Sequence, residues 1–286
     1  MKKAIAILMT AILLFAILAV PVMAEKGNKS YGDVPKTKDA ITIDAVKDAV
    51  YDKGLKLDIN RQYDGEGIGD YGTSGTAWVL WQDGFLFVYA EVKQVFLQDK
   101  AEAEDRQSGQ PWECDSLEVF LDFSNDAEGG ECDQFRIDAW GYRSFEQRTT
   151  TGDKSYGGDY NTADGIFEGK AAINGTNYNV EFKIPFQHPA DKGAQIGFLL
   201  QINDMVADGA GRSIVFSGSS SGESRSWQAQ EFDYIVLSAN EVSADVATIT
   251  NDTTEVAKTG DAGMIIFFAV IAVAAGAFVF RKQTAK

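Results

Sequence analysis

PWECDSLEVFLDF, residues 111–123, alternates from Asp115 onward between apolar and mostly polar side chains. A period of two is what a strand with one buried face requires, because successive side chains of a strand point to opposite faces. The segment therefore predicts a β-strand whose odd positions lie in a core, while Trp112 stands in the loop before it. The apolar set is Leu117, Val119, Leu121 and Phe123.

Short alternating segments of the same kind recur between residues 39 and 238, separated by clusters of Gly, Asp and Asn. No stretch there sustains a helical period over three turns. Many short strands joined by Gly-rich turns are typical of sandwiches. The predicted fold is all-β, a β-sandwich or jelly roll of two antiparallel sheets. The clearest predicted strands are 77–81, 85–92, 116–123, 134–140, 165–173, 178–184, 195–204 and 233–237.

Both ends of the chain have the composition of targeting segments. Lys2 and Lys3 precede an apolar run that ends in small residues at Ala24, as in a secretory signal peptide. Near the other end, 263–280 is uncharged, long enough to cross a membrane as a helix, and followed by basic residues. The predicted parts are a signal peptide (1–24), an irregular segment (25–38), the sandwich (39–238), a polar spacer (239–258) and a surface anchor (259–286).

The anchor has a second feature. Residues 256–261 (VAKTGD) are similar to the LPxTG-type sorting signal of Gram-positive surface proteins, although Ala257 stands where that signal has proline. Attachment to the cell wall and retention as a transmembrane helix both stay open. Either way, the sandwich is expected outside the cell.

The charge balance limits the partners. The chain has 26 Lys and Arg against 42 Asp and Glu, a net charge of −16. Such a surface repels nucleic acid and anionic lipid headgroups. The two cysteines, Cys114 and Cys132, are compatible with a disulfide in an exported protein. They would nevertheless lie at opposite ends of a hairpin, and His188 is the only histidine, which disfavours zinc.

Parity places polar groups together on the second face of the predicted sheet. Ser116 and Glu118 share this face with Arg136, and Gln201 and Asn203 share it if their strand is adjacent. A carboxylate, a guanidinium and two amides suit a sugar, because such groups can bind neighbouring hydroxyls in pairs. Glu118 and Arg136 are also expected to orient one another.

Five segments in the same order resemble the signatures of family 9 carbohydrate-binding modules. The resemblance covers about residues 39–238. The segments are 81–88 (WQDGFLFV), 111–122 (PWECDSLEVFLD), 134–136 (QFR), 197–204 (GFLLQIND) and 226–227 (SW).

The resemblance implies a β-sandwich with a slot for the end of a sugar chain, without catalysis. By position, Trp112 and Trp227 enclose a sugar, and Glu118, Arg136 and Gln201 bind its hydroxyls. The family has asparagine where Ser224 stands, so a shorter side chain changes that contact. The implied partner is a plant polysaccharide or oligosaccharide, such as xylan or cellulose, and no organic cofactor is expected.

Structural calcium is a further implication of the family. The acidic loop residues Asp126, Glu128 and Glu131 are candidate ligands, although no fixed spacing defines a site. Trp78 and Trp81 lie within a strand pattern and are predicted to be structural. Trp140 is expected either at the rim of the site or over a sheet edge.

Three alternatives remain open on the sequence alone. Asp115, Glu118 and Asp122 are carboxylates of the kind that hydrolyse glycosides. His188 and Met205 are candidate axial ligands of a haem in a related DOMON-type sandwich. An adhesive sandwich without a ligand slot is the third alternative.

Overall fold

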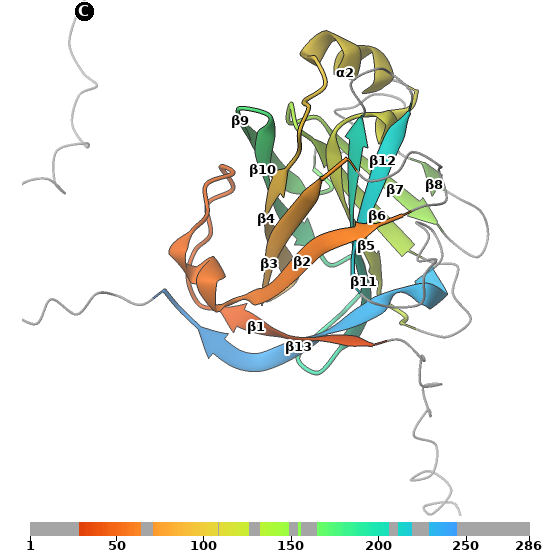
Figure 1. Cartoon of the computed structure of the whole chain (residues 1–286). Coiled ribbons are helices and arrows are strands. Elements are labelled where there is room, and N and C mark those ends of the chain that lie inside the picture. Colours follow the sequence, from red (N-terminus) through yellow and green to blue (C-terminus); the bar gives the residue numbers. More distant parts are fainter. Residues whose placement is uncertain are drawn as a thin grey trace, which may run out of the picture. The chain divides into compact units, whose positions relative to one another are not determined.

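The strands of this computed structural model form one hydrogen-bonded sheet that folds over into two layers (Figure 1). The structure describes residues 29–63, 71–107, 109–125, 132–148, 154–155, 165–205, 211–218 and 229–244. Its strands are β1 (Ser30–Thr37), β2 (Leu55–Gln62), β3 (Ser74–Gln82), β4 (Phe85–Lys93), β5 (Ser116–Asp122), β6 (Cys132–Asp138), β7 (Arg143–Arg148), β8 (Lys154–Ser155), β9 (Glu168–Asn174), β10 (Asn177–Pro185), β11 (Gln195–Met205), β12 (Arg212–Ser217) and β13 (Asp233–Val242).

The strand order explains the two layers. It runs β8-β7-β6-β5-β11-β12-β2-β3-β4-β10-β9, with β2 paired to β12 on one side and to β3 on the other. The first layer thus holds β5, β6, β11 and β12, and the second holds β3, β4, β9 and β10. All pairings along this path are antiparallel. The predicted all-β sandwich is confirmed.

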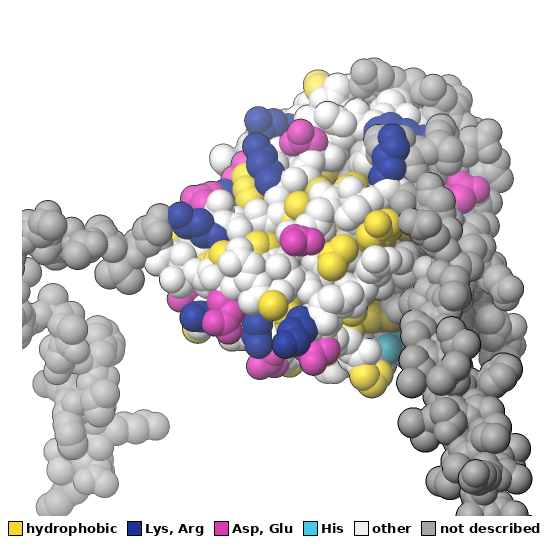
Figure 2. All heavy atoms as spheres, turned by 90° about the horizontal axis from the view of Figure 1, so that it is seen from below, with side chains coloured by type: hydrophobic (Ala, Val, Ile, Leu, Met, Phe, Trp, Pro, Cys, Tyr) yellow, Lys and Arg dark blue, Asp and Glu magenta, His cyan; other side chains and the backbone are white. Residues whose placement is uncertain are grey.

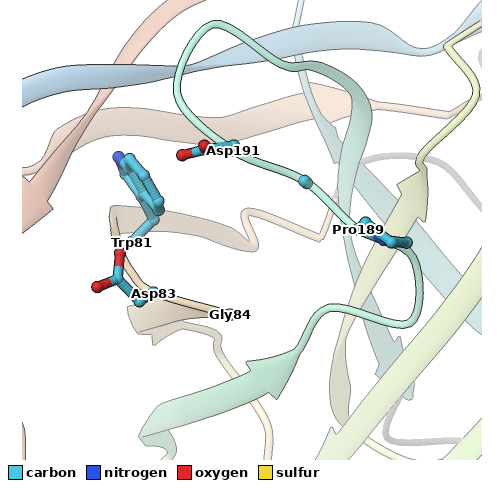
Figure 3. Close-up of a pocket in the computed structure, with 6 residues that line it drawn as sticks. Trp81, Asp83, Gly84, Pro189 and Asp191 are labelled. Atoms are coloured by element: carbon cyan, nitrogen blue, oxygen red, sulfur yellow. The ribbon is translucent and has the colours of Figure 1, made fainter.

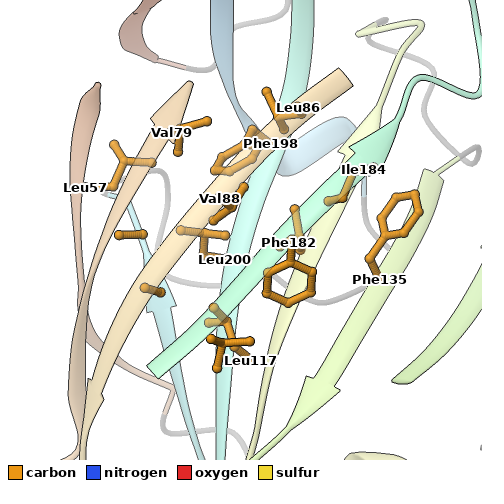
Figure 4. Packing of buried hydrophobic residues seen from close by; sticks show 14 of the residues in the cluster. Leu57, Val79, Leu86, Val88, Leu117, Phe135, Phe182, Ile184, Phe198 and Leu200 are labelled. Carbon is orange, nitrogen blue, oxygen red and sulfur yellow. The ribbon is translucent and has the colours of Figure 1, made fainter. Parts of the chain in front are cut away.

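The core lies between the layers (Figure 4). Val88 and Phe182 from the second layer meet Leu117 and Leu200 from the first, and all four are fully buried. On β5 the odd positions 117, 119 and 121 face this core, as the alternation predicts, and Phe123 packs at its edge. The even positions therefore face the outer side of the first layer.

β1 corrects one prediction, because Ser30–Thr37 is a strand where the polar sequence indicates irregular chain. It pairs in parallel with β13, and this pairing extends β13 to Val242, beyond the predicted domain boundary at 238. The register shifts around Gly32, whose φ is +124°, and around Pro35, which has no N–H to donate. A partner about two hundred residues away supplies these bonds, so the local sequence does not reveal them.

The two cysteines do not form a disulfide. Cys114 and Cys132 are both buried and free. Cys114 precedes β5, whose first residue Ser116 pairs with Asp138, whereas Cys132 begins β6 at the other end of the hairpin. The two cysteines lie at opposite ends of the β5–β6 hairpin, as the sequence indicates, and this separation excludes a disulfide.

Helix is scarce in the described ranges. They contain α2 (Lys100–Gln107) and the short 3-10 turns η1 (Ala49–Lys53), η3 (Pro111–Glu113) and η4 (Ala229–Glu231). None of these helices has the length and apolar character needed to span a membrane. The predicted signal peptide (1–24) and membrane span (263–280) lie outside the described residues.

Charges of both signs are interspersed on the underside of the sandwich (Figure 2). Lys36 pairs with Asp83 at 2.6 Å between Nζ and Oδ1, and Lys38 pairs with Glu241 at 2.8 Å. Local pairing of this kind means that the acidic excess of the chain does not form one continuous patch on the visible part of this face.

Candidate functional site

A row of polar side chains crosses the outer face of the first layer. Glu118 on β5 lies directly opposite Arg136 on β6 and Gln201 on β11, and Arg136 lies opposite Ser144 on β7. The predicted polar face is therefore assembled as the alternation indicates. The structure brings Glu118, Arg136 and Gln201 together, although they are separated by up to 83 positions in the chain.

Glu118 and Arg136 form a buried ion pair. Arg136 donates from Nε to Glu118 Oε1 at 2.6 Å and from Nη1 to Ser144 Oγ at 2.8 Å. The exposed fractions of the two charged side chains are 1% and 4%. Because removing two charges from water costs about as much as their attraction returns, such a pair is weak evidence for stability. Its fixed geometry instead suits a binding role.

Asn203 on β11 joins this pair to the amide of Gln201. Its Nδ2 donates to Glu118 Oε1 at 2.8 Å and to Ser116 Oγ at 3.0 Å. Its Oδ1 accepts from Gln201 Nε2 at 2.8 Å and from Arg212 Nη1 at 2.9 Å. We call Glu118, Arg136, Gln201 and Asn203 the polar array.

Two oxygens of the polar array have no hydrogen-bond partner among the described residues. They are Glu118 Oε2 and Gln201 Oε1, and both are buried. An unpaired buried acceptor costs about 1–3 kcal/mol. Each oxygen can therefore accept a further hydrogen bond from a ligand or a water molecule that reaches it.

Trp112 lies at the edge of the polar array in the short turn η3. Pro111 begins this turn with a fixed φ, and the N–H of Cys114 closes it on the Pro111 carbonyl at 3.3 Å. Arg212 donates to the Trp112 carbonyl at 3.2 Å while also contacting Asn203, so it connects the turn to the array. Trp112 remains 37% exposed.

Several predicted site residues lie outside the described ranges. They are Trp227 and Ser224, and the candidate calcium ligands Asp126, Glu128 and Glu131. Within the described ranges, no group of three or more His, Cys, Asp and Glu side chains is placed to hold a metal ion. The roles of these five residues remain predictions.

Asp115 connects the segments around the Trp112 turn. Its Oδ2 accepts from the N–H of Gln98 at 2.7 Å and from Gln94 Nε2 at 3.0 Å, and its Oδ1 accepts from the N–H of Met205 at 2.7 Å. Its carbonyl accepts from the N–H of Ala139 at 2.8 Å. One carboxylate thus ties the end of β11 and the segment after β4 to the start of β5.

Buried carboxyl groups near the Trp112 turn make the stability of the protein depend on pH. Burial raises the pKa of Asp115 to about 7 and the pKa values of Asp138 and Asp204 to about 6. From about pH 4 to about pH 7 the folded protein keeps protons that the unfolded chain has released. We therefore expect the free energy of unfolding to fall as pH rises through this window and to lose this dependence above it.

Urea unfolding over this pH range measures the effect. Asp115→Asn removes the carboxyl whose pKa is highest of the three, so its profile should be flatter than that of the wild type between about pH 5 and pH 7. Parallel profiles would show that Asp115 does not contribute.

The carboxylates of the hydrolytic alternative do not face one another. Asp115 and Glu118 project to opposite faces, and Asp122 Oδ1 accepts from Ser124 and Asn125 at the far end of β5. At about 3.3 Å per residue, Glu118 and Asp122 are about 13 Å apart. Catalytic carboxyl pairs of glycosidases are about 5–9.5 Å apart. The arrangement is therefore unsuitable for hydrolysis by these residues.

The haem alternative fails on distance. His188 packs against Phe123, with ring centroids 5.5 Å apart, at the end of the sandwich where β11 begins. Met205 is the last residue of β11, roughly 30 Å further along the strand. These two side chains cannot ligate one iron.

A concave region lies away from the polar array, at the end of the sandwich where β3 and β4 are joined (Figure 3). It has a volume of about 410 Å³ and is lined by Trp81, Asp83, Gly84, Pro189, Ala190 and Asp191. Trp81 is only 2% exposed and donates from Nε1 to the Ser238 carbonyl at 2.9 Å. This groove offers no open aromatic surface, and the predicted structural role of Trp81 is confirmed.

The other two tryptophans within the described ranges also have partners. Lys47 Nζ lies 3.5 Å from the ring centroid of Trp78, which packs at the edge of a small apolar cluster. Trp140 follows β6 and donates from Nε1 to the Gln98 carbonyl at 3.2 Å. Trp112 is therefore the most exposed tryptophan of the described chain.

Fold and site together define a β-sandwich that carries a polar array beside an exposed aromatic side chain on one outer sheet face. The chain belongs to the family described as carbohydrate family 9 binding domain-like, whose model matches residues 43–240. The resemblance seen in the sequence is thereby confirmed.

Two relatives are xylan- or glucan-degrading enzymes by name. Endo-1,4-beta-xylanase C of Paenibacillus barcinonensis is 31% identical over 177 residues, which are 61% of this chain and 14% of that protein. Exoglucanase XynX of Acetivibrio thermocellus is 32% identical over 162 residues, which are 56% and 13%. The matched region of this chain thus spans about one seventh of each relative.

Two solved structures share the fold. Both are family 9 carbohydrate-binding modules from Caldicellulosiruptor kristjanssonii, one in complex with cellotriose and one with glucose. The first has a TM-score of 0.55 at 18% identity and covers 77% of this chain and 99% of its own. The second has a TM-score of 0.55 at 20% identity and covers 75% and 99%.

Proposed function

We propose that this protein is a non-catalytic carbohydrate-binding protein whose site is the polar array together with Trp112. The observation that carries the proposal is the pair of buried acceptors, Glu118 Oε2 and Gln201 Oε1, at the edge of which an aromatic side chain is exposed. Sugar hydroxyls supply donors, and the apolar C–H face of a sugar ring packs on an aromatic plane. The polar array offers the acceptors and Trp112 offers the aromatic plane.

The finer assignment uses the family resemblance. Trp112 and Trp227 stack on the two faces of a sugar at the end of a plant polysaccharide chain or of an oligosaccharide. Glu118, Arg136 and Gln201 hold its hydroxyls, and Ser224 makes a shorter contact than the family's asparagine. The complexes of the related modules with cellotriose and glucose support a gluco-configured ligand.

Calorimetric titration of the purified protein tests the proposal. We expect glucose, xylose, cellobiose or xylobiose to release heat and to change tryptophan fluorescence. The affinity should be modest, because the site is small and hydroxyl groups must be desolvated. A protein that gives neither signal with any of the four sugars would contradict the proposal.

The hydrolytic alternative is tested in the same samples. Incubation with xylan and with cello-oligosaccharides should release no reducing ends. Release that disappears in Glu118→Gln would show that the same site is catalytic, and the non-catalytic proposal would then be withdrawn.

We also propose display at the outer surface, held by the segment 259–286 in the membrane or the cell wall. β13 runs antiparallel to β11, so its last residues point away from the end of β11 that carries Asn203. Labelling of intact cells with an antibody against the sandwich tests the location, and labelling only after lysis would refute it.

A further inference from the structure

The hydrogen bonds of the polar array run in one fixed direction, and this direction limits what can bind. We propose that Asn203, held by Arg212, is a positioning residue that makes the site selective for sugars with two free hydroxyl donors. The inference rests on the proposed function and deepens it. It also adds Arg212, which the sequence pattern does not assign to the site, and gives Asn203 a specific role there.

The orientation of the Asn203 amide follows from its neighbours. A guanidinium can only donate hydrogen bonds, so the Asn203 atom that faces Arg212 Nη1 at 2.9 Å must be the oxygen. A carboxylate can only accept, so the atom that faces Glu118 Oε1 at 2.8 Å must be the nitrogen. Asn203 is wholly buried. Exchanging its O and N atoms would place a donor against the Arg212 guanidinium and an acceptor against the Glu118 carboxylate.

The orientation of Asn203 determines that of Gln201. Because Asn203 Oδ1 accepts, the Gln201 atom at 2.8 Å must be the nitrogen, which leaves Gln201 Oε1 as the atom without a hydrogen bond. Glu118 Oε1 already takes bonds from Arg136 and Asn203, which leaves Glu118 Oε2. Both atoms left for a ligand are thus acceptors, and neither can turn into a donor without breaking the chain of bonds.

A ligand must therefore supply two donors at this place. A neutral sugar with free hydroxyls does so. A methyl ether or an acetyl ester supplies only an acceptor, and a uronic acid brings a negative charge toward Glu118. We infer that substituted or acidic sugar units are excluded from this position of the site.

Asn203→Asp tests the positioning role directly. In the variant the new side chain can donate to Glu118 only when it is protonated. As pH rises, two carboxylates face each other, with Arg136 on β6, Glu146 on β7 and Arg212 on β12 as the other charged groups on this face. We expect the ratio of wild-type to variant affinity for glucose or cellobiose to increase at least tenfold from about pH 5 to about pH 8.

Asn179→Asp is the matched control. Asn179 lies half-buried on β10 in the second layer, opposite Glu91, so the variant adds the same charge away from the polar array. Its affinity ratio to the wild type should stay constant with pH. Circular dichroism at each pH confirms that only folded protein is compared. If Asn203→Asp does not fold, Arg212→Met replaces it, because Arg212 is partly exposed and the variant removes one bond from Asn203 and one from the Trp112 turn.

Monodeoxyfluoro glucoses test the selectivity itself, because fluorine accepts weakly and does not donate. Replacement at two ring positions should weaken binding at least tenfold, and the loss should be smaller in Asn203→Asp at high pH. If the wild type binds glucose and Asn203→Asp binds equally at every pH, the positioning role is overturned while the proposed function stands. A wild type that binds no sugar at all refutes the proposed function, and this inference with it.

Discussion

Trp112→Ala is expected to weaken sugar binding by about thirtyfold or more while leaving the fold nearly as stable as before. Central aromatic side chains of binding sites commonly contribute about 2 kcal/mol or more. Trp112 is 37% exposed, and its neighbours contact its backbone through Arg212 and through the turn η3. Removing the ring therefore removes a ligand surface and little of the core. Titration calorimetry and urea unfolding of the same sample measure the two quantities.

Val119→Ala is the reciprocal control. Val119 lies on the same segment, is fully buried, and faces the core from an odd position of β5. We expect it to lower the free energy of unfolding by about 2 kcal/mol and to leave sugar affinity unchanged where the protein is folded. If Trp112→Ala instead lowers stability as much as Val119→Ala and leaves affinity intact, Trp112 is a packing residue.

The two faces of β5 could be predicted from the sequence because the side-chain period of a strand is two, whatever its partners are. The same holds for β11, where Leu200 and Ile202 face the core and Gln201 and Asn203 face outward. The five matching motifs added the family and the names of most site residues. The alternation is a local signal, and the family resemblance is carried by short sequence motifs.

Contacts that depend on register could not be derived in this way. Nothing in the order of residues shows that Gln201 lies directly opposite Glu118, since a shift of one residue would turn the side chain to the core. Arg212 was missed because β12 is a short strand in a Ser- and Gly-rich region. The alternation of β12, which places Ile214 and Phe216 on the same face as Arg212, could have indicated this strand.

β1 was not predicted from the sequence, because its formation also depends on pairing with a distant strand. Its own sequence contains Gly32 and Pro35, which are unfavourable within strands. The strand forms because β13 offers a parallel edge and because Val34 and Thr37 are buried there. Pairing with a distant strand thus overrides the local preference, and only the structure shows the pair.

Arg136→Met is expected to have the largest effect on stability. The variant leaves Glu118, whose side chain is 1% exposed, without its guanidinium partner. Breaking a buried pair from one side costs about 3–5 kcal/mol, because the remaining charge is neither hydrated nor paired. Urea unfolding at neutral pH should show this loss, and part of the stability should return at low pH, where the carboxyl can be protonated.

Lys183→Met provides the comparison with a surface pair. Lys183 Nζ lies 2.6 Å from Glu168 Oε1, and the exposed fractions of the two side chains are 28% and 62%. An exposed pair contributes at most about 1 kcal/mol, so this variant should unfold at nearly the wild-type urea concentration. Equal losses from both lysine and arginine variants would contradict the assignment of Glu118 and Arg136 as a buried pair.

The double variant Glu118→Gln with Arg136→Met separates folding from binding. A neutral amide at position 118 removes the unpaired charge, so the double variant should regain most of the stability that Arg136→Met loses. Sugar affinity should not return, because an amide in place of the carboxylate cannot accept from Asn203 and from a hydroxyl with equal strength, and the guanidinium is gone. Stability that recovers without affinity would show that the pair is kept for its hydroxyl-binding geometry. Recovery of both would show that the polar array does not bind the sugar.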